Sequence, residues 1–415
     1  MMNSIYVTSE IGKLKKVIIH TPGPELEAMT PETAVELLYD DILNLPSARK
    51  EHEQLKGVLD KISETLEVES LLKDILAEPT IRQQLLEALC RQLGECESIG
   101  ALLEMDSTTL AAQLIRGTLL KRDTLERFLS PRQYALPPLP NLFFTRDTAM
   151  VINDHVFIGN MANRIRIAEA VLMSFIFRHH PAFLCQDFLI DASKENIPQA
   201  TFEGGDLLIL QEDTVLIGMS ERTSPQGIDY LVEQFKKGRK IKQVFAVMLP
   251  RIRATIHLDM IFTMINYDKA VVFPPLILAK NALDVIHINM TNPKSNTLKR
   301  FPYLLDALRQ VDINLEPVYW GGSDELYQKR EQWQSGANFF TIAPGKIIGY
   351  GMNTYTFLEL AKAGIPRVEA EDVLTAKVDL NSLNKYAVAI SGNELNRGGG
   401  GCRCMTLPIL RDALI

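Results

Sequence analysis

The chain has 415 residues, a net charge of −7 and no block of lysine and arginine, which argues against a nucleic-acid partner. Its five cysteines form no regular framework, which favours a reducing compartment. The opening residues lack the basic start and apolar run of a signal peptide, and no apolar run approaches the length of a membrane span. We therefore expect a cytoplasmic protein with a sizeable core and no membrane partner.

The beginning of the chain predicts a strand followed by a long helical region. Residues 11–20 form a largely apolar run that ends in a turn at 21–24, and Thr30 before Pro31 predicts the start of a helix. We expect residues 31–133 to form a small antiparallel helical bundle. Apolar residues recur at helical spacing through this region, first in the series Leu55, Val58, Leu59, Ile62 and Leu66.

A repeated pattern follows the proline-rich segment 135–141. Each copy has a polar residue, a buried strand, a hairpin turn and a second strand. With the opening strand as a fifth copy, the spacing predicts ββαβ repeats of roughly 55 residues and an α/β fold. We expect one unit at 1–30 and 134–415, interrupted by the bundle at 31–133. The copies begin at Asp147, Asp206, Asp259 and Asn338, and helical stretches at 165–177, 226–237 and 353–363 follow three of them.

Repeats arranged around an axis bring equivalent strand starts together at one end of the fold. The four polar residues that begin the copies would then face a common mouth. In a solenoid they would instead line a ridge. The first arrangement predicts a polar site built from distant parts of the chain.

The stretch around Cys404 has the features of a nucleophile loop. Residues 398–401 are four consecutive glycines, and residues 405–410 predict a buried strand. A thiol between a mobile loop and a rigid strand is well placed to react, and we expect Arg403, Arg397 and the loop N–H groups to lower its pKa.

Two other interpretations of this loop agree less well with the sequence. No Gly-Lys-Ser/Thr follows the glycines, so the loop is not a phosphate loop. Cys402 and Cys404 could form half of a metal site, but Cys90, Cys96 and Cys185 supply no second pair with zinc spacing.

Acidic groups and a histidine stand at the strand starts. Asp147 ends the motif FTRD, Glu203 lies in FEGGD, and His257 and Asp259 form HLD, in which positions i and i+2 share a face of a strand. Carboxylates in one pocket repel, so a cation is expected between them, either a metal or a guanidinium. A thiolate aimed at a guanidinium carbon, with histidine moving protons, would give covalent catalysis.

The motifs FTRD, FEGGD, SERTS (220–224), HLD and the terminal GGGGCRC resemble those of arginine deiminase. This resemblance covers nearly the whole chain and implies a five-bladed α/β propeller, the pentein fold, with an inserted helical bundle. It implies Cys404 as nucleophile, His257 as general acid and base, and Glu203 as a support for the substrate and His257. Asp147 and Asp259 would grip the guanidinium. The implied substrate-binding residues, of which Arg166 and Arg222 would meet the amino-acid carboxylate, are Asn141, Phe144, Arg166, Arg222 and Arg397.

The sequence departs from that family's pattern at four positions. Thr148 follows Asp147 where proline is usual, and Ser335 stands where an acid is common. Gly399 stands where many members have a second loop arginine, and Cys402 lies beside the nucleophile. Recognition of the substrate end remote from the guanidinium is therefore the open point.

We expect a hydrolase that converts L-arginine to L-citrulline and ammonia without a cofactor or a metal. The alternatives are the same chemistry on another guanidine or a modified arginine, and a second hydrolysis to ornithine. Two alternatives come from other functional classes. One is a protein that binds a metal through Cys402, Cys404, His257 and Asp259, and the other is a binding protein without catalytic activity. The resemblance also favours a homo-oligomer, a dimer or higher.

Overall fold

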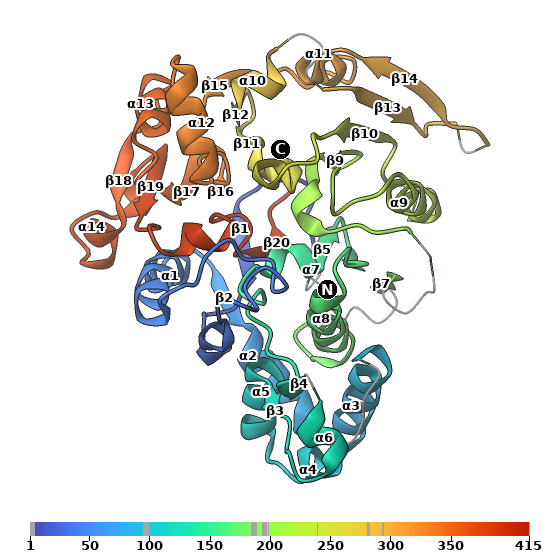
Figure 1. The fold of residues 1–415 in the computed structure, drawn as a ribbon. Helices are drawn as coiled ribbons and strands as arrows, with labels where there is room; N and C mark the ends of the chain where they lie inside the picture. Colours follow the sequence, from blue (N-terminus) through green and yellow to red (C-terminus); the bar gives the residue numbers. More distant parts are fainter. Residues whose placement is uncertain are drawn as a thin grey trace.

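The computed structural model describes residues 5–93, 99–130, 132–183, 189–192, 197, 199–238, 240–279, 283–292 and 294–414. These residues form a mixed α/β fold with five sheets of three to five strands and one two-stranded ribbon. Figure 1 shows the sheets spread around a common centre, with helices on the outside. Within the described ranges, no helix is both long and apolar enough to cross a membrane.

The five larger sheets share one pairing pattern. In each, a middle strand pairs antiparallel with one neighbour and parallel with the other. The first sheet is β20 (Leu407–Arg411), β1 (Leu14–Ile19) and β2 (Glu64–Glu67), and the second is β5 (Ala149–Ile152), β6 (His155–Ile158) and β7 (Leu189–Asp191). The third contains β8 (Leu207–Gln211), β9 (Thr214–Met219) and β10 (Gln243–Met248). The fourth is β11 (Phe262–Asn266), β12 (Lys269–Val272) and β15 (Glu316–Tyr319), and the fifth contains β16 (Phe340–Ala343), β17 (Lys346–Tyr350) and β19 (Tyr386–Ile390).

Helices connect the parallel strands, as such pairs require. The connecting helices are α1 (Leu45–Asp60), α8 (Ile167–His179), α9 (Pro225–Gly238), α10 (Pro274–Ile277), α11 (Leu304–Arg309) and α13 (Thr354–Lys362). The middle strands and their antiparallel partners are buried almost throughout, because helices and neighbouring sheets cover both of their faces. The predicted hairpins after Asp147, Asp206, Asp259 and Asn338 are confirmed, as are the helical stretches after three of them.

Further strands extend two of the sheets. Two strands that were not predicted, β13 (Val285–Asn289) and β14 (Thr297–Phe301), extend the third sheet beyond β10 by antiparallel pairing. Most of β14 is exposed, so it has little of the apolar signal that marks a buried strand. The fifth sheet gains β18 (Arg367–Glu369), which is followed by α14 (Ala370–Leu374).

The helical region lies at one end of the molecule, at the bottom of Figure 1. Leu85, Leu110 and Met150 belong to one hydrophobic cluster, so the helices share a core with the sheets beside them. The helices are α2 (Val68–Leu76), α3 (Pro79–Leu93), α4 (Ile99–Leu103), α5 (Ser107–Arg116) and α6 (Leu125–Leu129), with the ribbon β3 (Thr118–Leu119) and β4 (Tyr134–Leu136) beside them.

Two local predictions in this region were wrong. Leu66 does not continue the helix that contains Leu55, because α1 ends at Asp60 and Leu66 pairs with Ile18 as part of β2. The helix expected at Thr30 is instead a run of turns. This run ends near Leu38, whose φ of 69° is incompatible with a right-handed helix.

Candidate active site

The polar residues that begin the repeats lie together at the centre of the fold. Asp147 lies in α7 (Thr145–Thr148), and Asp206 and Asp259 lie in short 3₁₀ turns immediately before β8 and β11. Asn338 precedes β16, and its amide links two of these positions: it donates to the Asp259 carbonyl at 3.3 Å and accepts from the Cys404 amide at 3.0 Å. The strand starts are therefore close together, as repeats around an axis predict, and Asp147 among them lines the cavity that contains Cys404.

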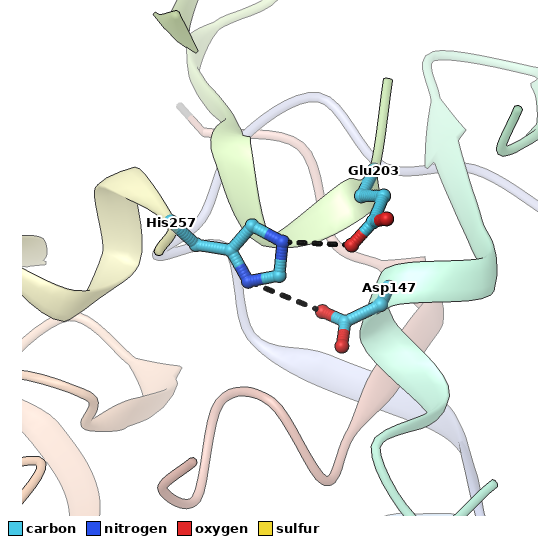
Figure 2. A group of neighbouring side chains, drawn as sticks. All are labelled: Asp147, Glu203 and His257. Atoms are coloured by element: carbon cyan, nitrogen blue, oxygen red, sulfur yellow. Dashed lines mark hydrogen bonds and ion pairs between the residues drawn. The ribbon is translucent and has the colours of Figure 1, made fainter. Parts of the chain in front are cut away.

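His257 lies between two carboxylates (Figure 2). Its Nε2 is 3.0 Å from Oε2 of Glu203, and its Nδ1 is 3.6 Å from Oδ1 of Asp147. The packing depends on Gly205, because a Cβ there would lie 2.5 Å from Nδ1 of His257. The glycine in FEGGD thus admits the imidazole close to the backbone.

This arrangement favours the protonated imidazole. Burial opposes the charge on His257, but Asp147, Glu203 and Asp206 outweigh it and raise its pKa to about 9. Burial also opposes the charge on Glu203, yet the contacts with His257 and Arg222 lower the pKa of that carboxyl. His257 is therefore a proton donor at neutral pH.

Cys404 lies beside Asp259 at the end of the glycine loop. Its Sγ is 3.6 Å from Oδ2 of Asp259, and the side chain is almost fully buried. Burial and the charges of Asp259 and Asp147 raise the thiol pKa well above its usual value. The expected lowering of this pKa was wrong in sign, because Arg403 acts only weakly against burial and the carboxylates.

Arg397 and Cys402 have other surroundings than expected. Arg397 points away from the thiol and pairs with Asp41 at 2.6 Å and Glu394 at 3.1 Å. It lines an outer cavity rather than the cavity that contains Cys404. Cys402 and Cys404 are both free thiols, and burial raises the pKa of Cys402 as well. Of the other cysteines weighed above, Cys96 and Cys185 lie outside the described residues.

Asp259 is held by a buried chain of charges. Arg403 donates from Nη1 to Oδ2 of Asp259 at 2.8 Å, and its Nε and Nη2 donate to Glu10 at 3.1 and 3.0 Å. Because two carboxylates surround this guanidinium, its charge is compensated inside the protein. Arg403 thus orients Asp259 rather than activating the thiol.

Two carboxylate oxygens at the centre are available to accept hydrogen bonds, and one of them also faces His257. Within the described part of the chain, Oδ1 of Asp147 and Oδ1 of Asp259 are buried and have no hydrogen-bond partner. Unsatisfied buried oxygens are costly, and a cation with several N–H donors would satisfy both. The arrangement fits a planar guanidinium placed beside Cys404.

The two predicted carboxylate-binding arginines differ in how fully they are used. Arg166 donates to Asp147 at 2.6 Å and to Glu169 at 3.0 and 2.8 Å, so its guanidinium is already occupied. Arg222 is buried, and its Nη1 lies 3.8 Å from Oε1 of Glu203 without a hydrogen bond among the described residues. Arg222 is therefore the better placed of the two to meet an additional anion.

Asn141 and Phe144 line the same cavity as Cys404. The Asn141 amide donates to the Leu37 carbonyl at 2.8 Å, which ties the run of turns to the site. Phe144 packs on Phe143 with ring centroids 4.0 Å apart, and a Cβ at Gly400 would lie 2.5 Å from its ring. The glycine loop can therefore pack on Phe144 only because it has no side chain there.

A metal ion would find one suitable cluster in the described residues. Asp147, Glu203 and His257 offer ligand atoms that all lie within 4.8 Å of one another. Their oxygens and nitrogens already pair with one another and with Arg166, so a substrate cation fits the same space. The metal set of Cys402, Cys404, His257 and Asp259 is not brought together among these residues.

Several residues of the site were not identified from sequence. Glu10, Glu169 and Arg253 each pair with a residue of the site or line its cavity. Of the three, only Glu169 could have been found from the sequence, because its i, i+3 spacing from Arg166 favours an ion pair on a helix. Asp206 had been noted only as a strand start. Burial raises its pKa to about 7, and it accepts from Ser220 at 2.6 Å and from the Leu258 amide at 2.9 Å.

Comparison with known proteins places this geometry in context. The sequence profile of the family described as arginine deiminase matches residues 35–411. Over its whole length the chain is 34% identical to the arginine deiminase of Listeria innocua serovar 6a, with all of both chains covered. It is 33% identical to that of Bacillus thuringiensis subsp. konkukian, with 99% of each chain covered.

Solved structures with similar folds have little sequence similarity. The amidinotransferase of saxitoxin biosynthesis from Microseira wollei gives a TM-score of 0.56 at 11% identity, covering 99% of this chain and 98% of that one. The N-terminal domain of a cyanobacterial arginine dihydrolase, bound to product, gives 0.53 at 13% identity, covering 96% and 99%. A dimethylarginine dimethylaminohydrolase gives 0.51 at 12% identity, covering 95% and 99%. At these identities the similarity concerns the fold alone.

Proposed function

The chain belongs to the arginine deiminase family, and we propose that it hydrolyses L-arginine to L-citrulline and ammonia through a covalent intermediate on Cys404. The identity of the substrate is inferred from the relatives named above. The observation that supports the reaction is that one oxygen each of Asp147 and Asp259, near the buried thiol, accepts no hydrogen bond from the described residues. A guanidinium there would gain charge-assisted hydrogen bonds from both acids.

The first step uses the substrate's charge. The resting thiol is protonated, because burial and the two carboxylates raise its pKa. A guanidinium between these carboxylates offsets their charge and favours the thiolate, which is the reactive form. The thiol proton passes to Asp259, whose Oδ2 already faces Sγ at 3.6 Å. The sulfur then bonds to the guanidinium carbon.

Ammonia leaves with the help of His257. Protonated at neutral pH, the imidazole gives its proton to the leaving nitrogen as the C–N bond breaks, which leaves a thiouronium on Cys404. The neutral imidazole then takes a proton from water, and the hydroxide attacks the same carbon. The C–S bond breaks as Asp259 returns the thiol proton to the sulfur, and the proton of the new hydroxyl group is released and taken up by ammonia as ammonium. Citrulline and the thiol result, and neither a cofactor nor a metal enters these steps.

The finer architecture is part of the proposal. The shared pairing pattern of the five sheets supports the blades of a pentein-type propeller around this site. From sequence alone we expected the catalytic unit at 1–30 and 134–415 and the insertion at 31–133, which would assign α1 and β2 to the insertion. Because α1 and β2 follow β1 as connecting helix and parallel strand, we place the start of the inserted helices at Val68. The expectations of a cytoplasmic location and a homo-oligomer are retained.

Mass-spectrometric product analysis tests the function. The purified protein is incubated with L-arginine, agmatine and N-methylated arginines, and citrulline, ornithine and ammonia are quantified. Citrulline and ammonia in equal amounts from arginine are expected. Ornithine would indicate a second hydrolysis, turnover of a methylated arginine alone would change the substrate, and no turnover of any guanidine would refute the proposal.

A further inference from the structure

Arg253 stands where two cavities meet. It begins the 3₁₀ turn Arg253–Thr255, four residues before His257. Together with Gly399 it lines both the inner cavity, which contains Cys404, and the outer cavity, which contains Asp40 and Arg397. A substrate whose guanidinium lies at Cys404 therefore extends its other end toward Arg253.

The Arg253 head occupies the space above Gly399. A Cβ on Gly399 would lie 3.1 Å from Nη2 of Arg253, and Gly399 has a φ of 83°, in the left-handed region. A side chain at position 399 would therefore compete with Arg253 for the same volume. The cation at the mouth of the inner cavity comes from the turn before His257, and the glycine loop contributes only backbone there.

The present partners of Arg253 are readily exchanged. Its Nε contacts Oδ2 of Asp40 at 2.6 Å, and Nη2 donates to the Leu38 carbonyl at 2.7 Å. Asp40 is half exposed and Arg253 is 29% exposed, so solvent weakens their pairing. Arg166, in contrast, is buried and fully engaged with Asp147 and Glu169.

We propose that Arg253 binds the α-carboxylate of the substrate, beside Arg222, and is a specificity-determining residue for free amino-acid guanidines. On binding, the guanidinium of Arg253 exchanges the Asp40 carboxylate for that of the substrate, which it can hold through two parallel N–H donors. This inference rests on the proposed function, since it takes the substrate to be arginine. It also explains how the chain recognises a carboxylate although position 399 has no side chain.

Kinetics of Arg253→Ala and Arg253→Gln with arginine and agmatine test this assignment, because agmatine lacks the carboxylate. We expect KM for arginine to rise about tenfold or more with kcat changed only a few-fold, and kcat/KM for agmatine to change less than about twofold. Arg251→Ala is the matched control, because Arg251 is exposed and has no partner among the described residues. It should leave both substrates unaffected. The glutamine variant keeps the aliphatic part of the side chain if the alanine variant is unstable.

Two further variants distinguish binding of the substrate carboxylate by Arg253 from a purely structural role of this side chain. Asp40→Asn removes the ion pair but keeps the cation, so KM for arginine should stay level or fall. If Arg253 only anchored the segment that contains Leu38, Asp40→Asn would reproduce the Arg253→Ala defect, and agmatine would suffer equally. The double variant Arg253→Ala with Gly399→Arg should regain part of the arginine affinity, because the new side chain enters the vacated volume.

Failure of the inference differs from failure of the proposed function. If the wild-type protein makes citrulline from arginine but Arg253→Ala and Arg253→Gln keep the wild-type KM, Arg253 does not bind the carboxylate. If the wild-type protein makes no citrulline from arginine, the proposed function itself is wrong, and the inference fails with it.

Discussion

Replacing Asp259 with asparagine should separate two effects of one carboxylate. Asp259 faces the Cys404 thiol through Oδ2 and has a free Oδ1 among the described residues. It also contributes to the raised pKa of Cys404, after burial. The variant keeps the size of the side chain and removes its charge. Its thiol should therefore ionise at a lower pH than the wild-type thiol, although turnover should fall.

The loss of turnover follows from the missing contact with the guanidinium. A hydrogen bond to a charged group contributes about 1.5–3 kcal/mol, and each 1.4 kcal/mol corresponds to about a factor of ten. Losing one such bond at the reacting carbon predicts a fall in kcat/KM of about tenfold to a hundredfold. Every guanidine substrate should be affected alike, because the bond is to the group that they share.

The assay measures both effects on the same protein. Iodoacetamide alkylation of Cys404 is followed against pH by mass spectrometry, and citrulline formation is followed in parallel. Asp268→Asn is the control, since Asp268 is an exposed aspartate at the β11–β12 turn and should change neither quantity. The reasoning is refuted if Asp259→Asn leaves the thiol titration unmoved or keeps kcat/KM within about threefold of wild type.

Four further outcomes are expected. Cys404→Ala should abolish turnover while Cys402→Ala keeps most of it, and a trapped adduct on Cys402 would move the nucleophile. Activity should survive prolonged chelation and gel filtration, and recovery only with zinc or manganese would favour a metal enzyme. Arg222→Ala should cripple arginine turnover but scarcely change that of agmatine, and unchanged arginine turnover would contradict the assignment. Glu203→Gln should lower the His257 pKa from about 9 and move the alkaline limb of kcat to lower pH. The charge of His257 also stabilises the folded state, and this contribution to the free energy of unfolding is full below about pH 6.5 and lost as pH rises through about 9. The pairing of Glu203 with His257 would be refuted if Glu203→Gln changed neither the alkaline limb of kcat nor the pH dependence of urea unfolding.

The elements with strong local signals were predictable. Each hairpin after Asp147, Asp206, Asp259 and Asn338 combines an apolar run with a turn, and burial of both faces makes that run continuous. The short strand with Leu66 was missed because its pairing with β1, far away in the sequence, decides its conformation. Exposed β14 gave little apolar signal.

The chemical state of the site was less predictable than its members. Sequence motifs identified Cys404, His257, Asp147 and Asp259, but the pKa of a thiol depends on three-dimensional distance and burial. Arg403 is adjacent to Cys404 in sequence, yet its charge is directed to Glu10 and Asp259. The Arg253–Asp40 pair joins residues 213 positions apart, and no local pattern marks such a contact.

The contact between Glu10 and Arg403 joins residues 393 positions apart and lies directly beneath the reaction centre. Together with the pairing of β1 with β20, it makes the site depend on some of the longest chain closures in the fold. Such contacts carry a high entropic cost and form slowly, and partly folded chains expose apolar surface in the meantime. Intermediates that lack this closure would contain all the catalytic residues and no catalytic power. During refolding, the return of activity would therefore lag behind the return of helical signal and report the closure between β1 and β20.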